Sequence, residues 1–308
     1  MPPHPSTFSI VARDPDQNAV GVAVQSKFIG VGAVVPFAAA DAGAIATQSY
    51  ANVEYGPAGL DLLREGYTAG EAVTELTTAD EGAPRRQVGI VGQDGSVAAF
   101  TGADCLDYAG DRQGENYTVQ GNILKNRETI DAMPAAYEAT DGGLPERLIA
   151  ALHAGNAAGG DARGEQSAAL YVARPGGGYD GGNDRWIDVR VDDHETPIDE
   201  LERVFKLYDI TLLAREQPDD LVTLEGETAV AVQETLASLG HFSGTPSREF
   251  EDAARGALEA FRDVNNFENH SIAILEDAIA RGWDEAEGNG ADRLVDAIWH
   301  GLSRLDRA

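Results

Sequence analysis

The sequence has little positive charge, almost no cysteine and no long apolar run, and each scarcity excludes a class of protein. Its 308 residues contain one cysteine, Cys105, so neither a disulfide framework nor a cysteine zinc cluster can form within the chain. No stretch reaches the roughly 20 apolar residues that a membrane span needs. The N-terminus also lacks the basic and apolar regions of a signal peptide. We therefore expect a soluble cytoplasmic protein without a membrane partner.

Lysine is the rarest of the charged residues. Of 23 basic residues only Lys27, Lys125 and Lys206 are lysines, and 52 Asp and Glu residues bring the formal net charge to −29. The acids are spread along the whole chain and 43% of the residues are hydrophobic, which excludes a disordered acidic tail. An acidic surface for a cationic ligand is one interpretation. We favour the other, a solvated acidic coat of the halophilic kind. Both argue against binding to nucleic acid.

The expected strands come in adjacent pairs, and so do the expected helices. Apolar and β-branched runs predict strands at 7–13, 19–26, 31–37, 43–49, 86–92, 96–101, 166–173 and 186–192. Helical periodicity predicts two helices within 55–79 and further helices near 126–139, 144–154 and 197–213. This order lacks the strand–helix alternation of a doubly wound parallel sheet. It predicts an α+β fold of antiparallel sheets covered by paired helices.

The pattern changes after residue 213. Residues 214–226 read as a linker, and everything beyond them reads as helical, including an apolar stripe through Phe250, Ala254, Leu258 and Phe261. We therefore predict a domain over 7–213 and an all-α module over 227–308. Residues 1–6, "MPPHPS", precede the first domain as an extension or a propeptide.

Thr7 stands at the head of the first predicted strand. A hydroxyl residue becomes a self-sufficient nucleophile when it is also the N-terminal residue, because its α-amine, with an ordinary pKa of about 8, is the nearest general base. From pattern alone, an ordinary β-branched strand residue is the favoured interpretation of Thr7.

Several motifs in order resemble one family. "TFSIVARDPDQNAVGVAVQSKFIGVGAVVPFAAADAGAIATQSY", "RRQVGIVGQDGSVAAFTGADC", "YTVQGNILKN", "GGDARGEQSAALYV" and "NDRWIDVRVDDHETPIDEL" are similar to the domain of unknown function 1028 family, over roughly residues 7–212. The resemblance implies the N-terminal nucleophile (Ntn) hydrolase fold, a four-layer αββα sandwich, with a threonine nucleophile at Thr7.

The six residues before Thr7 depart from the family pattern, in which the threonine follows the initiator Met. Pro2, Pro3 and Pro5 hinder simple aminopeptidase trimming. Three explanations stay open. The start codon is mis-assigned, the Ser6–Thr7 bond is cut autocatalytically, or the protein is not an N-terminal nucleophile enzyme.

Two short motifs supply candidate partners for Thr7. Ser26 and Lys27 end the strand expected beside the first, where an ammonium can lower the amine pKa and hold charge near an oxyanion. In "QGN", Gly121 permits close backbone approach and Asn122 can donate to an oxyanion. Each motif has a structural alternative, an exposed edge lysine and a helix-capping turn. Thr47 and Gln48, at the end of another early strand, are candidate substrate-binding residues.

The loop "GGDARGEQS" supplies further substrate-binding candidates, namely Asp161, Arg163 and Gln166. Arg163 can clamp a substrate carboxylate, although a structural Asp–Arg pair is the favoured interpretation. Asp192, Asp193 and His194 resemble a metal cluster, but a strand end followed by a helix cap explains them better. We expect no metal or cofactor. Cys105 lacks a local histidine partner and reads as a small apolar residue.

The C-terminal segment is similar to a peptidoglycan-binding helical module, and a dimerisation or lid role is an alternative. The sequence favours a hydrolase of a small amide, with Thr7, Lys27 and Asn122 as catalytic residues, in a homo-oligomer that we expect to be a dimer. The alternatives are a non-catalytic protein that binds a small metabolite in the same cleft and a scaffold that acts through the helical module.

Overall fold

The computed structural model describes residues 7–213 and 220–305. They form two compact units, Met1–Glu202 and Arg203–Ala308, the first α+β and the second helical, so the predicted fold class is confirmed. The division falls within a helix that begins at Pro197, upstream of the predicted domain end at residue 213. The extension 1–6 and residues 214–219 of the predicted linker lie outside the described residues.

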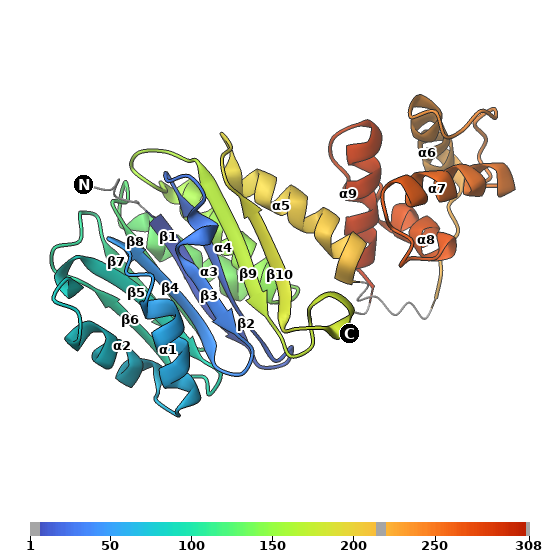
Figure 1. Cartoon of the computed structure of the whole chain (residues 1–308). Helices are drawn as coiled ribbons and strands as arrows, with labels where there is room; N and C mark the ends of the chain where they lie inside the picture. The colour runs from blue at the N-terminus through green and yellow to red at the C-terminus, as the bar shows by residue number, and fades with distance from the viewer. Residues whose placement is uncertain (1–6, 214–219, 306–308) are drawn as a thin grey trace. The chain divides into compact units, whose positions relative to one another are not determined.

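Two antiparallel sheets form the centre of the first unit (Figure 1). The six-stranded sheet has the order β10-β9-β2-β1-β8-β7 and is built from β1 (Thr7–Asp14), β2 (Ala19–Ser26), β7 (Gly110–Gly114), β8 (Tyr117–Asn122), β9 (Ser167–Ala173) and β10 (Arg185–Val191). The four-stranded sheet has the order β3-β4-β5-β6, from β3 (Pro36–Ala39), β4 (Gly43–Ser49), β5 (Arg86–Gly92) and β6 (Val97–Thr101).

Paired helices cover the outer face of each sheet, which completes the αββα order (Figure 1). α1 (Tyr55–Arg64) and α2 (Ala69–Thr78) pack on the four-stranded sheet, and α3 (Glu128–Ala139) and α4 (Leu144–Ala158) pack on the six-stranded sheet. Thr68 and Glu71 form the predicted capping box at the start of α2. Gly59 allows α1 to lie close to β4, because a Cβ there would meet Ile45 Cδ1 at 2.5 Å.

The layer between the sheets is apolar along most of its length and polar at one end. Val11, Val22, Val24, Ala46 and Val91 fill the apolar part and are fully buried. Side chains alternate across a strand, so the inward-facing positions of β1 run from Val11 back to Ser9 and Thr7. The inter-sheet layer therefore becomes polar where β1 begins.

Two parts of the first unit differ from the prediction. The strand expected over 31–37 begins later, since β3 spans Pro36–Ala39. Val31–Ala33 forms a 3-10 turn instead. Gly30 has a left-handed φ of 63°, and the Val31 N–H donates to Ser167 Oγ instead of to a strand. The hairpin β7–β8 was not predicted, because "GDRQG" carries no apolar alternation.

The second unit buries its own apolar core. Its helices are the end of α5 (Pro197–Tyr208), a π-helical turn η4 (Asp209–Leu213), α6 (Gly226–Ser238), α7 (Asp252–Val264), α8 (Ile272–Gly282) and α9 (Gly290–Ser303). The predicted stripe through Phe250, Ala254, Leu258 and Phe261 lies in this core. None of the helices in 7–213 and 220–305 has the length and apolar content to cross a membrane.

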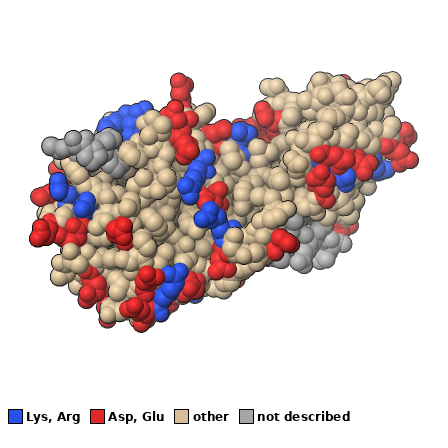
Figure 2. All heavy atoms as spheres, viewed as in Figure 1, with Lys and Arg blue, Asp and Glu red and all other residues tan. Residues whose placement is uncertain are grey.

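Charged side chains are mixed over the visible surface. Figure 2 shows Asp and Glu distributed over many elements, with Lys and Arg between them. Many arginines are ion-paired, for example Arg64 with both Asp41 and Asp61. Exposed pairs of this kind contribute little stability each. On the visible face the acidic side chains are therefore spread over many elements and do not form one patch.

Glycines let α8 and α9 pack with their backbones in contact. A Cβ at Gly301 would overlap the carbonyl oxygen of Ala278, and one at Gly282 would overlap that of Ala297. We expect Gly301→Ala to destabilise the second unit by about 3 kcal/mol, because the helices must separate. Gly256→Ala in α7 is the matched control, since nothing lies within 4 Å of its Cβ position. Urea unfolding should show a gain of up to about 1 kcal/mol for this control, and equal effects would contradict the packing account.

Candidate functional site

Thr7 lies at the end of the six-stranded sheet, between two of the residues that the sequence singled out. In the antiparallel register Thr7 is opposite Ser26 on one side and Asn122 on the other. All three residues are fully buried. The Thr7 hydroxyl donates to Ser26 Oγ at 3.2 Å. The fold therefore brings Thr7, Ser26 and Asn122 together. For Ser26, the hairpin expected from the first two strands predicted this position.

A cluster of buried amides lies between the sheets beside Thr7. Gln48 of β4 reaches across from the four-stranded sheet and donates to the Thr7 carbonyl oxygen at 3.4 Å and to Gln87 Oε1 at 2.9 Å. Gln48 also accepts from Ser9 Oγ at 2.7 Å, and Ser9 Oγ in turn accepts from Gln120 Nε2 at 2.6 Å. These hydrogen bonds fix Gln48, a predicted binding residue, against the start of β1.

Gln87, the second residue of β5, is the centre of this cluster. Its Oε1 accepts from Asn122 Nδ2 at 3.0 Å as well as from Gln48. Its Nε2 donates to the Gly121 carbonyl oxygen at 2.8 Å and to Thr101 Oγ1 at 2.9 Å. A buried polar group is costly unless it is paired, and Gln87 is paired at both ends. It thereby orients Asn122, the residue beside Thr7.

The described hydrogen bonds around Thr7 involve amide and hydroxyl side chains, namely those of Ser26, Gln48, Gln87 and Asn122. The first carboxylate along the described bonds is Asp111, which accepts from Thr101 Oγ1 at 3.1 Å and so lies beyond Gln87. Neutral amides and hydroxyls cannot take a proton from a threonine hydroxyl at ordinary pH. Among the described residues, the side-chain hydrogen bond of Thr7 therefore goes to a hydroxyl and not to a base.

Asp161 joins the predicted loop "GGDARGEQS" to the end of β2. Its carboxylate accepts from the Lys27 backbone N–H at 2.7 Å and from the Arg163 backbone N–H at 2.8 Å. Arg163 also pairs with it through the guanidinium at 3.3 Å. Asp161 is buried, and it forms the Asp–Arg pair that the sequence suggested. It holds the 160–166 loop next to Ser26 and, through the Leu124–Asp161 bridge, next to the segment after Asn122.

Lys27 is exposed, and its ammonium donates to the Glu165 carbonyl oxygen at 2.8 Å. Gln166 donates to Asp193 at 3.0 Å on the outside of the same loop. The Thr47 hydroxyl donates to the Asn52 carbonyl oxygen at 3.0 Å, so it closes the turn after β4. The fold thus places these three predicted residues near the Thr7 end of the sandwich. Their described side-chain hydrogen bonds are made with loop residues and not with Thr7.

Two non-glycine residues with left-handed backbones border the cluster. Ser49 follows Gln48 with a φ of 69°, and Ile123 follows Asn122 with a φ of 51°. Such conformations cost about 1–3 kcal/mol and collect at functional sites. For a β-branched residue such as Ile123 the conformation is a genuine outlier. Strain at the ends of β4 and β8, two of the strands that contribute amides, supports a functional assignment for this end of the sandwich.

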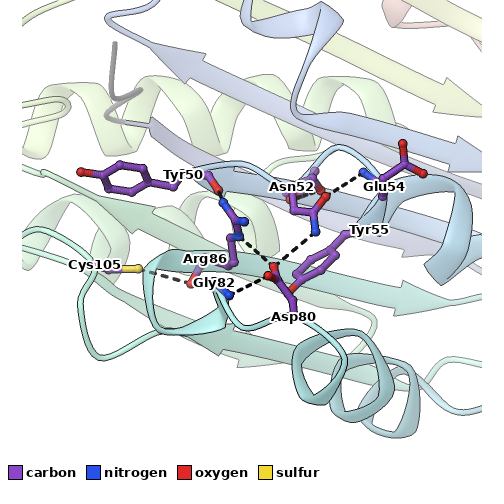
Figure 3. A network of polar contacts seen from close by, with 9 residues as sticks. Tyr50, Asn52, Glu54, Tyr55, Asp80, Gly82, Arg86 and Cys105 are labelled. Carbon is purple, nitrogen blue, oxygen red and sulfur yellow. Dashed lines mark hydrogen bonds and ion pairs between the residues drawn. The ribbon is translucent and has the colours of Figure 1, made fainter. Parts of the chain in front are cut away.

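A second polar network supports the ends of β4 and β5 (Figure 3). Asp80 accepts from Arg86 Nε at 2.9 Å, Tyr55 Oη at 3.0 Å and the Gly82 N–H at 2.7 Å. The Arg86 guanidinium holds the pKa of the Asp80 carboxyl well below its usual range, while burial and Asp80 raise the pKa of Tyr55. Arg86 is opposite Ser49 in the sheet, so the network anchors the strained turn.

The other residues weighed from the sequence have structural contacts. Cys105 donates to the Arg86 carbonyl oxygen at 3.3 Å, and burial raises the pKa of its thiol, which disfavours a thiolate nucleophile. His194 Nδ1 accepts from the Thr196 N–H, as expected for a turn before a helix. Within 7–213 and 220–305 no three His, Cys, Asp or Glu residues gather as metal ligands.

Sequence reasoning missed Gln87, Gln120 and Ser9. The signal was present as polar residues at alternate positions of otherwise apolar strands, as in Thr7 and Ser9 of "TFSIV". An inward polar residue in a buried strand needs a buried partner. That partner could not be assigned, because Gln48 and Gln87 reach Thr7 and Asn122 from the other sheet.

The fold and this end of the sandwich define the class of protein, an αββα sandwich with a threonine at the head of a central strand. Residues 7–201 match the model described as "Family of unknown function (DUF1028)", and the chain belongs to this family. Residues 211–299 match the model described as "Putative peptidoglycan binding domain". Both matches confirm the resemblances found in the sequence.

Among solved structures, this chain is similar to a crystal structure of a protein of the same family. It is the crystal structure of protein SPO2555 from Silicibacter pomeroyi, with 32% sequence identity and a TM-score of 0.61. The similarity covers 66% of this chain and 89% of that chain. No curated protein matches the sequence.

Proposed function

We propose that the first unit hydrolyses a small amide, with Thr7 as the nucleophile once it is the N-terminal residue. The observation that carries this proposal is the surroundings of Thr7. A hydroxyl at a strand head donates to Ser26, lies opposite Asn122 and is bordered by neutral amides among the described residues. That arrangement suits a nucleophile whose base is its own α-amine.

The chemistry follows in two steps. The α-amine takes the proton of the Thr7 hydroxyl as Oγ1 attacks the amide carbon, and a tetrahedral oxyanion forms. Collapse of this intermediate breaks the C–N bond, the ammonium returns the proton to the leaving nitrogen, and an ester on Thr7 remains. Water then attacks the ester with the amine again as base, which releases the acid and restores the hydroxyl.

Asn122 is the proposed oxyanion donor, because it is opposite Thr7 in the strand pair and is oriented by Gln87. Lys27 contributes through its positive charge. A hydrogen bond to the Glu165 carbonyl oxygen holds its ammonium in place. The proposed substrate is a short amide with a carboxylate that meets Arg163. The Arg163 side chain remains 36% exposed while it pairs with Asp161, which leaves it accessible to such a group.

The first test is N-terminal sequencing and intact mass of the purified chain, combined with a panel of short amides. We expect a chain that begins at Thr7, and hydrolysis of at least one amide by that species alone. A protein that keeps residues 1–6, cleaves none of the amides in the panel and yet binds a small metabolite would contradict the proposal. That outcome would favour the non-catalytic binding protein, which is consistent with the complete burial of Thr7.

A further inference from the structure

A groove lies on the helical layer outside the four-stranded sheet, away from the amides between the sheets. It has a volume of about 450 Å³ and is lined by residues 52–65 of the α1 region and 75–80 of the α2 region. Ala58 and Leu62 of α1 and Leu76 and Ala79 of α2 supply its apolar lining. At one end lie Asn52, Tyr55 and Asp80, which belong to the network in Figure 3.

The helices create this groove because of their residue spacing. Ala58 and Leu62 are four residues apart on α1, so they lie on one face, and Leu76 of α2 is three residues before Ala79, the C-cap residue of that helix. The two alanines leave space that longer side chains would fill. The volume is within the range of small-molecule sites, about 300–1,000 Å³, which are mostly apolar with a few polar groups.

The polar end of the groove is rigid. Tyr55 Oη and Asn52 Nδ2 both donate to Asp80 Oδ2, at 3.0 and 3.2 Å, and Arg86 pairs with the same carboxylate. Asp80 is therefore neutralised and held in place before any ligand arrives. A preformed site loses less conformational entropy on binding.

The acidic residues that line the groove indicate which kind of ligand it can bind. Asp61 pairs with Arg64, whereas Glu54, Glu65 and Glu75 have no ion pair among the described residues. The lining includes no Lys or Arg. Three uncompensated carboxylates thus surround an apolar hollow, which disfavours an anion and favours an ammonium or guanidinium group carried on an apolar body.

We propose that the α1–α2 groove binds a small amphiphilic amine, a primary ammonium on an aliphatic chain. The chain packs on Ala58, Leu62 and Leu76, and the ammonium meets the carboxylates of Glu65 and Glu75. This site is independent of Thr7, so the proposed hydrolase can fail while this proposal stands, and the reverse also holds.

The test is isothermal titration of the full chain with hexylamine, hexanol and hexanoate at low and high salt. We expect hexylamine to bind at least about tenfold more tightly than hexanol, with hexanoate weakest, and salt to reduce the difference. The double variant Glu65→Gln and Glu75→Gln should lower hexylamine affinity about fivefold. Ala58→Phe, which fills the hollow without a change in charge, should lower it about tenfold or more.

Exposed acids outside the groove provide the control. Glu115→Gln with Asp141→Asn removes the same charge from two exposed residues that do not line the groove. This variant should bind hexylamine as the unmodified chain does. Equal binding of hexylamine and hexanol, an equal loss in the control variant, or full binding by Ala58→Phe would each overturn the proposal. Thermal unfolding of every variant verifies that it is folded.

Discussion

Thr7→Ala is expected to fold normally and to lose amide hydrolysis by at least about a thousandfold, because it removes the proposed nucleophile. The variant gives up one hydrogen bond, to Ser26 Oγ at 3.2 Å, and keeps the strand pairing of β1 with β2 and β8. Loss of one such bond costs only about 0.5–1.5 kcal/mol. Activity and stability should therefore separate, and both can be measured on the same preparation.

Thr7→Ser is the matched control for this experiment. It keeps the hydroxyl and the α-amine and removes only the methyl group, so it should retain a substantial part of the activity. A Thr7→Ala protein that still hydrolyses the amide at a comparable rate would show that Thr7 is not the nucleophile. Equal inactivity of the serine and alanine variants, with both folded, would also contradict the assigned role of the hydroxyl.

Gln87→Leu is expected to destabilise the first unit by about 3–5 kcal/mol. The substitution removes the acceptor of Asn122 Nδ2 and Gln48 Nε2 and the donor to the carbonyl oxygen of Gly121. Each buried group left unpaired costs about 1–3 kcal/mol. Whole-domain stabilities are only about 5–15 kcal/mol, so urea unfolding should detect this loss easily.

Gln113→Leu tests whether burial causes the effect. Gln113 is an exposed glutamine on β7, and its Nε2 donates only weakly, to Asp111 at 3.4 Å. Its replacement should change the free energy of unfolding by less than about 0.5 kcal/mol. Similar losses for the two variants would mean that the amide cluster between the sheets does not stabilise the fold in the way described.

Local pattern was sufficient to predict most of the first unit. The turn "DPDQ" between two β-branched runs placed Ser26 opposite Thr7, and Thr68 with Glu71 marked the start of α2. These signals act over a few residues and so can be read from one sequence. The family resemblance added Asn122, which the register of β8 places beside Thr7.

Contacts between the sheets could not be predicted in this way. Gln48 and Gln87 meet Thr7 and Asn122 across the sandwich, from strands 41 and 35 residues away along the chain. Which faces of two sheets meet depends on the packing of the whole unit. The same limit explains why the hydrogen bonds of the Asp161 carboxylate with the Lys27 and Arg163 backbone N–H groups could not be predicted.

The most direct test of the central claim is to locate the acyl group after reaction with an activated ester such as a p-nitrophenyl ester. The chain is quenched in acid, digested and analysed by mass spectrometry. We predict one acyl group on the peptide that begins at Thr7, released by hydroxylamine as an ester is, and absent from Thr7→Ala. An acyl group on any other residue, or the same labelling of Thr7→Ala, would contradict the assignment of Thr7 as the nucleophile.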